Sequence, residues 1–274
     1  MKCSSAKGWL RRLVFSWLVL LPGLVLAQPG SPDGLTYKTG YSAIRRLGLD
    51  LFKSMKPKYK PFVHIEPVSV ETDVMPFIKL EEYPDEPKPL RMVFISVGFV
   101  DLVNNVAHAK AIDKKQKGYF QKYVLSLALE TGEKELKELP NLSDKQFWTE
   151  DMMNEQLSNF NQIVGVAVGV KLAQFYLGQY QKYDESLKDQ NGKPVPINNL
   201  LTPQEWELCN KAGVRNALDA GYGIEGVKAL YDCIDKMPKR PVWTSYFLPD
   251  NIKVSKLLRD MEKIQRDFFA GKSD

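Results

Sequence analysis

The histidines are the first candidates for chemistry in this chain, because an imidazole group transfers protons near neutral pH and binds metals. The chain has two of them among its 274 residues. His64 lies in a segment of alternating residues and is expected on the polar face of a strand, whereas His108 lies in a segment with helical periodicity. A single helical histidine is more often a packed residue than a catalytic one. We therefore keep His108 only as a minor functional candidate.

Four acidic residues precede the most apolar segment of the chain, namely Asp144, Glu150, Asp151 and Glu155. A pair of carboxylates hydrolyses glycosides when the distance between them is fixed. Nothing in the sequence fixes that distance here, and acidic residues are favoured in the N-terminal half of a helix. We expect a solvated helix face, with a glycosidase as the alternative. The sequence has no glycine-rich phosphate loop, no Cys-x-x-Cys and no strand–turn–helix nucleophile motif.

Residues 1–27 have the three parts of a secretory signal peptide. Basic residues and no acids come first, an apolar stretch runs from Leu13 to Leu26, and Val25-Leu26-Ala27 ends it. This stretch is shorter than the ~18 residues that a spanning helix needs, which favours a cleaved signal peptide. An uncleaved membrane anchor is the alternative. We expect an exported protein, periplasmic or extracellular, with no stable membrane span after cleavage.

The charge balance argues against a nucleic-acid partner. The chain has 38 basic and 33 acidic residues, and four of the basic ones lie in residues 1–27. The remaining chain therefore has 34 basic and 33 acidic residues, a net charge of +1. Binding to nucleic acid requires a basic excess that neutralises phosphates.

The cysteines that remain after residue 27 are Cys209 and Cys233, each twelve residues away from Gly221. If Gly221–Gly223 is a turn between two antiparallel helices, the two cysteines lie at the same level. A disulfide then has the separation that it needs, and an exported protein meets an oxidising environment. We therefore predict a disulfide, with two buried free thiols as the alternative.

The periodicity of the sequence predicts an α+β fold, predominantly helical with a small β-sheet. Residues 28–40 are expected to form a flexible leader, and residues 41–274 a single domain that ends in a helix. The sheet is expected within residues 62–97, most clearly at Arg91–Val97. Residues 243–249 are expected to be extended. The predicted helices are 41–54, 99–112, 118–130, about 146–187 with a break near 159–161, 203–220, 224–237 and 252–269.

Two capping boxes predict where helices begin. In a capping box, the hydroxyl at the N-cap accepts from the third amide of the helix while the third side chain reaches back. Ser143 and Gln146 fit this pattern before the long helix. Thr202 and Glu205 fit it more strongly, because Pro203 stands at the first helical position between them.

The segment IVGVAVGVKLAQFYLGQY at residues 163–180 predicts a helix that is buried on most sides, because nearly every residue up to Leu172 is apolar or small. With RMVFISVGFVDLVNN at 91–105, EWELCNKAG at 205–213 and DAGYGIEGVKALYDCIDKM at 219–237, it forms four blocks in order. In these blocks the chain resembles the zinc metallopeptidases of the CAAX prenyl endopeptidase type, over about residues 90–237.

The resemblance places the zinc-binding positions of that family at residues that do not bind zinc. Val170 and Gln174 stand where the two histidines of His-Glu-x-x-His would be, and Lys171 replaces the catalytic glutamate. A further histidine position holds Gln179. Zinc prefers imidazole, thiolate and carboxylate ligands, and an ammonium repels the metal.

Glu205 is the one position where a ligand type remains, and Cys209 replaces the acid that follows it. Glu205 also fits the capping box, where it needs no catalytic role. The resemblance therefore implies a pseudo-peptidase without cofactor that binds a protein or peptide in the cell envelope. The alternatives are an exported enzyme, such as a hydrolase of unknown chemistry that uses Glu205, His108 or the acidic run, and a structural helical envelope protein.

Overall fold

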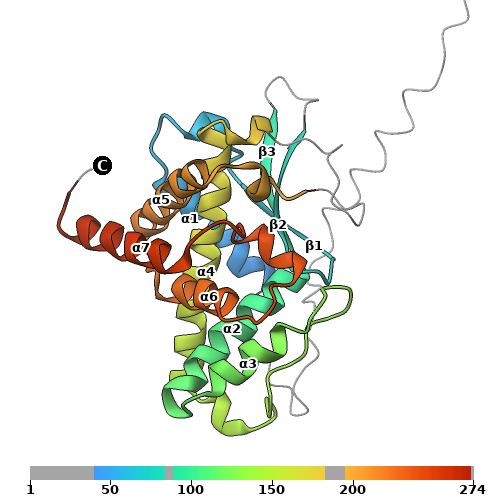
Figure 1. The fold of residues 1–274 in the computed structure, drawn as a ribbon. Helices are drawn as coiled ribbons and strands as arrows, with labels where there is room; N and C mark the ends of the chain where they lie inside the picture. The colour runs from blue at the N-terminus through green and yellow to red at the C-terminus, as the bar shows by residue number, and fades with distance from the viewer. Residues whose placement is uncertain (1–39, 84–88, 183–194, 273–274) are drawn as a thin grey trace, which may run out of the picture.

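The computed structural model describes residues 40–83, 89–182 and 195–272. Residues 1–39, which contain the predicted signal peptide and nearly all of the predicted leader, lie outside this part. The described part confirms a predominantly helical α+β fold with a small sheet (Figure 1). Its α-helices are α1 (Tyr41–Ser54), α2 (Val97–Lys115), α3 (Tyr119–Leu127), α4 (Glu150–Tyr176), α5 (Pro203–Asp219), α6 (Glu225–Asp235) and α7 (Val254–Phe269). Its strands are β1 (Val68–Glu71), β2 (Ile78–Tyr83) and β3 (Leu90–Ser96).

Helix α4 is the centre of the fold, which explains why its sequence is apolar on most sides. It packs against α1, α2, α5 and α6 and also against strands β2 and β3. It approaches α5 closely, since a Cβ atom on Gly213 would lie 2.3 Å from the backbone nitrogen of Val170. Within the described residues, we find no helix with both the length and the apolar character that crossing a membrane requires.

The sheet has the order β1-β3-β2, so β2 is an edge strand. Strand β3 pairs in parallel with β1 and antiparallel with β2, with Leu80 opposite Val93. One face of β2 packs on α4, because Ile78 and Leu80 are buried. Sequence periodicity located the sheet correctly, although residues 62–66 do not form a strand and a 3-10 helix, η1 (Lys60–Phe62), stands at their beginning.

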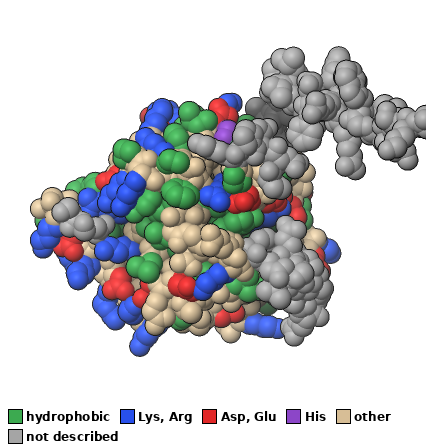
Figure 2. Space-filling model, turned by 90° about the horizontal axis from the view of Figure 1, so that it is seen from above, with side chains coloured by type: hydrophobic (Ala, Val, Ile, Leu, Met, Phe, Trp, Pro, Cys, Tyr) green, Lys and Arg blue, Asp and Glu red, His purple; other side chains and the backbone are tan. Residues whose placement is uncertain are grey.

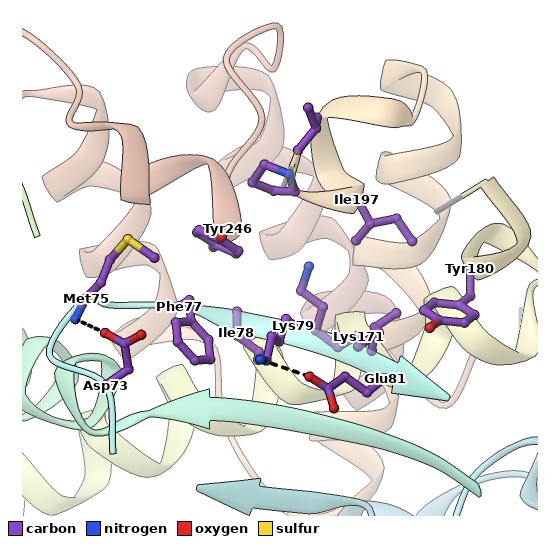
Figure 3. A pocket seen from close by; sticks show the side chains of 13 residues that line it. Asp73, Met75, Phe77, Ile78, Lys79, Glu81, Lys171, Tyr180, Ile197 and Tyr246 are labelled. Carbon is purple, nitrogen blue, oxygen red and sulfur yellow. Dashed lines mark hydrogen bonds and ion pairs between the residues drawn. The ribbon is translucent and has the colours of Figure 1, made fainter. Parts of the chain in front are cut away.

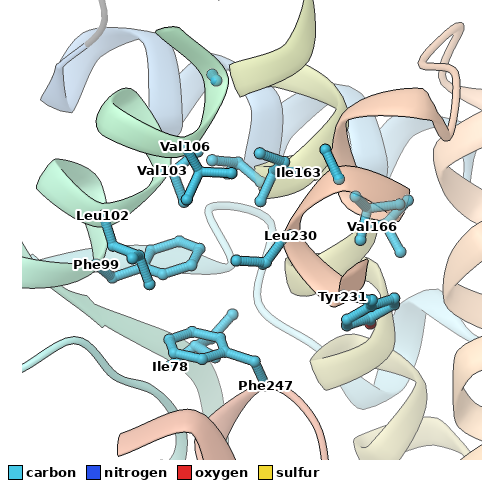
Figure 4. Close-up of a cluster of buried hydrophobic side chains, with 14 of the residues drawn as sticks. Ile78, Phe99, Leu102, Val103, Val106, Ile163, Val166, Leu230, Tyr231 and Phe247 are labelled. Atoms are coloured by element: carbon cyan, nitrogen blue, oxygen red, sulfur yellow. The ribbon is translucent and has the colours of Figure 1, made fainter. Parts of the chain in front are cut away.

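The hydrophobic core joins helices that are distant in the sequence. Figure 4 shows Phe99 and Val106 of α2 together with Ile163 of α4 and Leu230 of α6. All four are 0–1% exposed. Phe99 also stacks on Phe247, with ring centroids 5.2 Å apart, and so connects the segment before α7 to the core. This packing places α4 against the sheet.

The long helix differs from the prediction at its beginning. The side chain of Asp144, rather than Ser143, accepts a hydrogen bond from the backbone of Gln146. This local bond favours a short 3-10 helix, η2 (Lys145–Trp148), and α4 begins only at Glu150. The predicted capping box at Ser143 is therefore wrong.

Three further predictions of local structure are wrong. Helix α4 continues without a break through Asn159, which is 4% exposed and whose amide donates to the Glu155 carboxylate one turn earlier. Residues 243–249, predicted to be extended, begin with a 3-10 helix, η5 (Val242–Tyr246). Helix α4 also ends at Tyr176 and not near residue 187 as predicted, because Gly178 with its positive φ of 75° follows.

The predicted disulfide is also wrong, since Cys209 and Cys233 are both buried free thiols. The prediction assumed that α5 and α6 pack against each other after the turn at Gly221. Instead, both helices pack on α4, so the chain reverses without placing the two cysteines face to face. Burial raises the pKa of the Cys209 thiol to about 12.

Candidate functional site

The open edge of β2 borders a pocket of about 320 Å³. Its other walls come from η3 (Gln179–Lys182), from η4 (Ile197–Leu200) and from η5. Figure 3 shows Tyr246 and Ile197 on one side of this pocket and β2 on the other, with Lys171 of α4 between them. The pocket therefore combines a strand edge, apolar walls and a buried amine. We refer to it as the β2 pocket.

Lys171 is the unusual residue of the β2 pocket, because it is 2% exposed and has no carboxylate partner among the described residues. Its Nζ atom donates to Oδ1 of Asn198 at 3.0 Å. Burial lowers the pKa of Lys171 to about 7, because the charged form is poorly solvated inside the protein. Both the ammonium and the neutral amine are therefore populated near neutral pH.

Asn198 fixes the position of this amine. Its Oδ1 atom accepts from Lys171 and also from Nε2 of Gln174, the latter at 2.9 Å. Its Nδ2 atom donates to the backbone carbonyls of Ser245 and Tyr246 at 3.1 and 2.9 Å. The amide of Asn198 thus ties α4 and η4 to η5, and the walls of the pocket are held together by one buried side chain.

The backbone of β2 alternates between the sheet and the pocket. The amide of Ser96 donates to the carbonyl of Phe77, which makes these two residues a hydrogen-bonded pair of the antiparallel ladder. The amide of Val93, opposite Leu80, donates to Pro67 on the far side of β3. Because hydrogen-bonded and non-hydrogen-bonded pairs alternate, Ile78 and Leu80 direct their backbone N–H and C=O groups away from β3.

The positions singled out by the resemblance are only partly brought together. Lys171 and Gln174 share Asn198, and Val170 lies beside Lys171 around a small void behind the pocket. Gln179 instead faces a separate groove near Tyr59 and Tyr176. Glu205 does not line the β2 pocket, and no described hydrogen bond or ion pair connects it to Lys171.

Glu205 completes the capping box at the beginning of α5, as the sequence predicts. Its Oε2 atom accepts from the backbone amide of Thr202 at 2.9 Å, and Thr202 accepts from the Glu205 amide. Its other oxygen binds Lys182 at 2.5 Å. The hydrogen bond from Lys182, with those from Thr202, lowers the pKa of Glu205 to about 2. This carboxylate therefore remains ionised and engaged at the end of the helix.

These side chains do not form a zinc site. Among the described residues there is no cluster of three histidine, cysteine, aspartate or glutamate side chains that would hold a metal. The groups that meet at Asn198 are an amine and two amides, whereas zinc prefers imidazole, thiolate or carboxylate. The donor set does not fit the metal that the resemblance would imply.

The other candidates have structural roles. The Nε2 atom of His108 lies 2.6 Å from the carbonyl oxygen of Phe147, and burial lowers the pKa of this histidine to about 4. His108 also packs edge-on against Trp148, and it does not line the β2 pocket. Glu155 pairs with Lys114 at 2.7 Å, and Asp144 caps η2, so these two acids belong to local structure.

The surface carries both signs of charge. Figure 2 shows basic and acidic side chains interspersed with hydrophobic ones over the visible face. Comparison of the chain with family models, with curated proteins and with solved structures gives no match in any of the three. The case for a function therefore depends on the β2 pocket itself.

Proposed function

We propose that this chain is an exported, non-catalytic domain that binds a peptide or an extended protein segment along the free edge of β2. The single observation that carries the proposal is the position of β2 as an edge strand bordering the β2 pocket, with the main-chain groups of Ile78 and Leu80 directed away from β3. Peptides add to such edges through main-chain hydrogen bonds, while neighbouring pockets select side chains.

The side chains around the pocket favour binding over hydrolysis. Metal-dependent hydrolysis requires an activated water and a general base. Lys171 stands at the position matched to the catalytic glutamate, and its amine is already bonded to Asn198. We interpret the domain as a pseudo-peptidase: the resemblance in residues 90–237 supplies the scaffold, and the replaced motif residues remove the chemistry. The proposed setting, the cell envelope, follows from the signal-like residues 1–27.

Strand addition is tested with the purified protein and a library of random hexapeptides, from which the tightest binder is selected. Each residue of that peptide is then N-methylated in turn. In an added strand, alternate residues direct their amides toward the neighbouring strand. We expect methylation at every second residue to weaken binding at least about tenfold, which corresponds to about 1.4 kcal/mol per lost interaction.

Two results would contradict the proposal. Failure of any hexapeptide to bind excludes a peptide-binding edge of this kind, and loss of binding without a period of two excludes strand addition. Metal analysis of the same protein provides an independent check of the pseudo-peptidase interpretation. Zinc bound in a one-to-one ratio would contradict the interpretation that the domain has lost its metal site.

A further inference from the structure

We propose that the β2 pocket receives the C-terminal carboxylate of the bound peptide, and that the amino group of Lys171 is its counter-ion. This inference rests on the proposed function, since it names the end of the peptide that the site recognises. The geometry that points to it is a buried amine in the wall of a pocket beside an open strand edge. The following observations on charge and hydrogen bonding support it.

Lys171 has unused hydrogen-bonding capacity. A protonated lysine has three N–H donors, and the one described acceptor of Lys171 is the neutral amide oxygen of Asn198. Burying a charge without a charged partner is costly, so the free protein holds this group at the edge of ionisation. A ligand carboxylate that reaches Nζ would supply the missing charge and accept the remaining donors.

The acidic residues of the pocket are already occupied. Lys79 binds Glu81 at 2.9 Å and Glu71 at 3.0 Å, and Tyr83 also donates to Glu81 at 2.7 Å. The carboxylate of Asp73 accepts from the backbone amide of Met75. These contacts engage the acidic groups locally, so among the described residues Lys171 is the cation of the pocket that has no carboxylate partner. The buried amine without a described carboxylate partner therefore favours an anionic group next to Nζ of Lys171.

The strand edge favours a terminal carboxylate over an acidic side chain. A peptide that pairs with β2 keeps its main chain in the plane of the sheet, and its side chains project above and below that plane. The C-terminal carboxylate of the peptide therefore lies along the strand edge, unlike its side chains. Figure 3 shows Lys171 in the space between β2 and Tyr246, next to this edge. The rings of Phe77 and Tyr246, 5.9 Å apart, form an apolar wall beside it. An apolar last residue fits these surroundings.

The test uses random hexapeptides without Asp or Glu, synthesised with either a free carboxylate or a carboxamide at the C-terminus. Binding of both forms is measured with the wild-type protein, with Lys171→Met and with Lys256→Met. Lys256 is a matched control, because its amine pairs with Glu207 on the surface, away from the pocket. We expect the wild type and Lys256→Met to prefer the free carboxylate by at least about tenfold. Lys171→Met should bind both forms equally.

The comparison of the two forms on the wild-type protein decides the question even if a variant folds poorly. Equal affinity of acid and amide would overturn the carboxylate inference and leave strand addition intact. Failure of both forms to bind would overturn the proposed function as well. A third set, amidated but containing one internal Asp or Glu, tests the other source of a carboxylate. Stronger binding of this set than of the free acids would also contradict the inference.

Discussion

The Nζ atom of Lys171 lies 3.0 Å from Oδ1 of Asn198, in a contact that joins the central helix to the wall of the β2 pocket. The partner is an amide and not a carboxylate, which distinguishes this lysine from the ion pairs on the surface. Lys79, Lys228 and Lys256 each bind two carboxylates, and their pKa values are raised. The pKa of Lys171 shifts in the opposite direction because burial outweighs the raising effect of the Cys209 thiol, and no carboxylate among the described residues pairs with the amine.

Lys171 makes stability depend on pH. Its pKa falls from 10.5 to about 7 on folding, so between these values the unfolded chain binds more protons than the folded one. Stability therefore rises with pH above about 7 and is independent of this group below that value. We expect Lys171→Met to remove a gain of about 1.5 kcal/mol between pH 7 and 8.5. Urea unfolding at several pH values measures it.

The pH range of that experiment is limited by the buried thiols. Burial raises the pKa of Cys209 to about 12 and that of Cys233 further, so folded thiols retain protons that unfolded ones lose. This imposes the opposite slope above about pH 8.5. Lys256→Met serves as the control, and it should keep the wild-type slope. Parallel curves for the wild type and Lys171→Met would argue against a buried, perturbed amine.

Asn198→Ala should destabilise the protein by about 2–4 kcal/mol. The substitution removes the acceptor of Lys171 and Gln174 and the donor to two backbone carbonyls, all in the interior. The neighbouring Asn199 is exposed, so Asn199→Ala should change the free energy of unfolding by less than about 0.5 kcal/mol. If chemical unfolding gave the same change in free energy for Asn198→Ala and Asn199→Ala, the amide of Asn198 would not join α4, η4 and η5 as described.

Gly213→Ala tests the close approach of α5 to α4. An added methyl would lie 2.3 Å from the backbone nitrogen of Val170, so the helices must separate. We expect a loss of about 1–3 kcal/mol in the free energy of unfolding. Gly40→Ala is the control, since nothing lies within 4 Å of its added methyl. An unchanged melting temperature of Gly213→Ala would be inconsistent with the helix contact that positions Lys171.

Alkylation with iodoacetamide in denaturant, without a reductant, counts the free thiols. The structure predicts that Cys209 and Cys233 both react, because neither is bonded to the other. Intact mass then gives two labels if residues 1–27 have been removed, and three if Cys3 remains. If Cys209 and Cys233 were labelled only after reduction, the result would contradict the structure and support the disulfide predicted from the sequence.

Local patterns in the sequence predict most of the fold. The expected helix at residues 41–54 coincides with α1, and the capping box at Thr202 forms with both of its hydrogen bonds. A helix and its capping box depend on residues within one or two helical turns, so the sequence of a single segment is enough to predict them. The disulfide prediction failed because it depended on how α5 and α6 pack. Both helices pack on α4, which precedes them in the chain, and a local pattern does not contain such a long-range contact.

The site was predicted less completely than the fold. The replaced motif directed attention to Lys171 and Gln174, which do share a buried partner. That partner, Asn198, lies in a short segment without a recognisable motif, and Tyr246 lies in a segment predicted to be extended. Their roles arise from contacts between η4, η5 and α4, which no local pattern encodes. The edge position of β2 likewise depends on strand order, which periodicity does not give.

The most direct test of the account is amide hydrogen exchange along β2 with and without the selected hexapeptide. The amides of Ile78 and Leu80 point away from β3, whereas those of Lys79 and Glu81 belong to hydrogen-bonded pairs within the sheet. We predict that saturating peptide slows exchange at Ile78 and Leu80 at least about tenfold and leaves Lys79 and Glu81 nearly unchanged. Unchanged exchange at Ile78 and Leu80 when the peptide is bound would contradict binding at this edge.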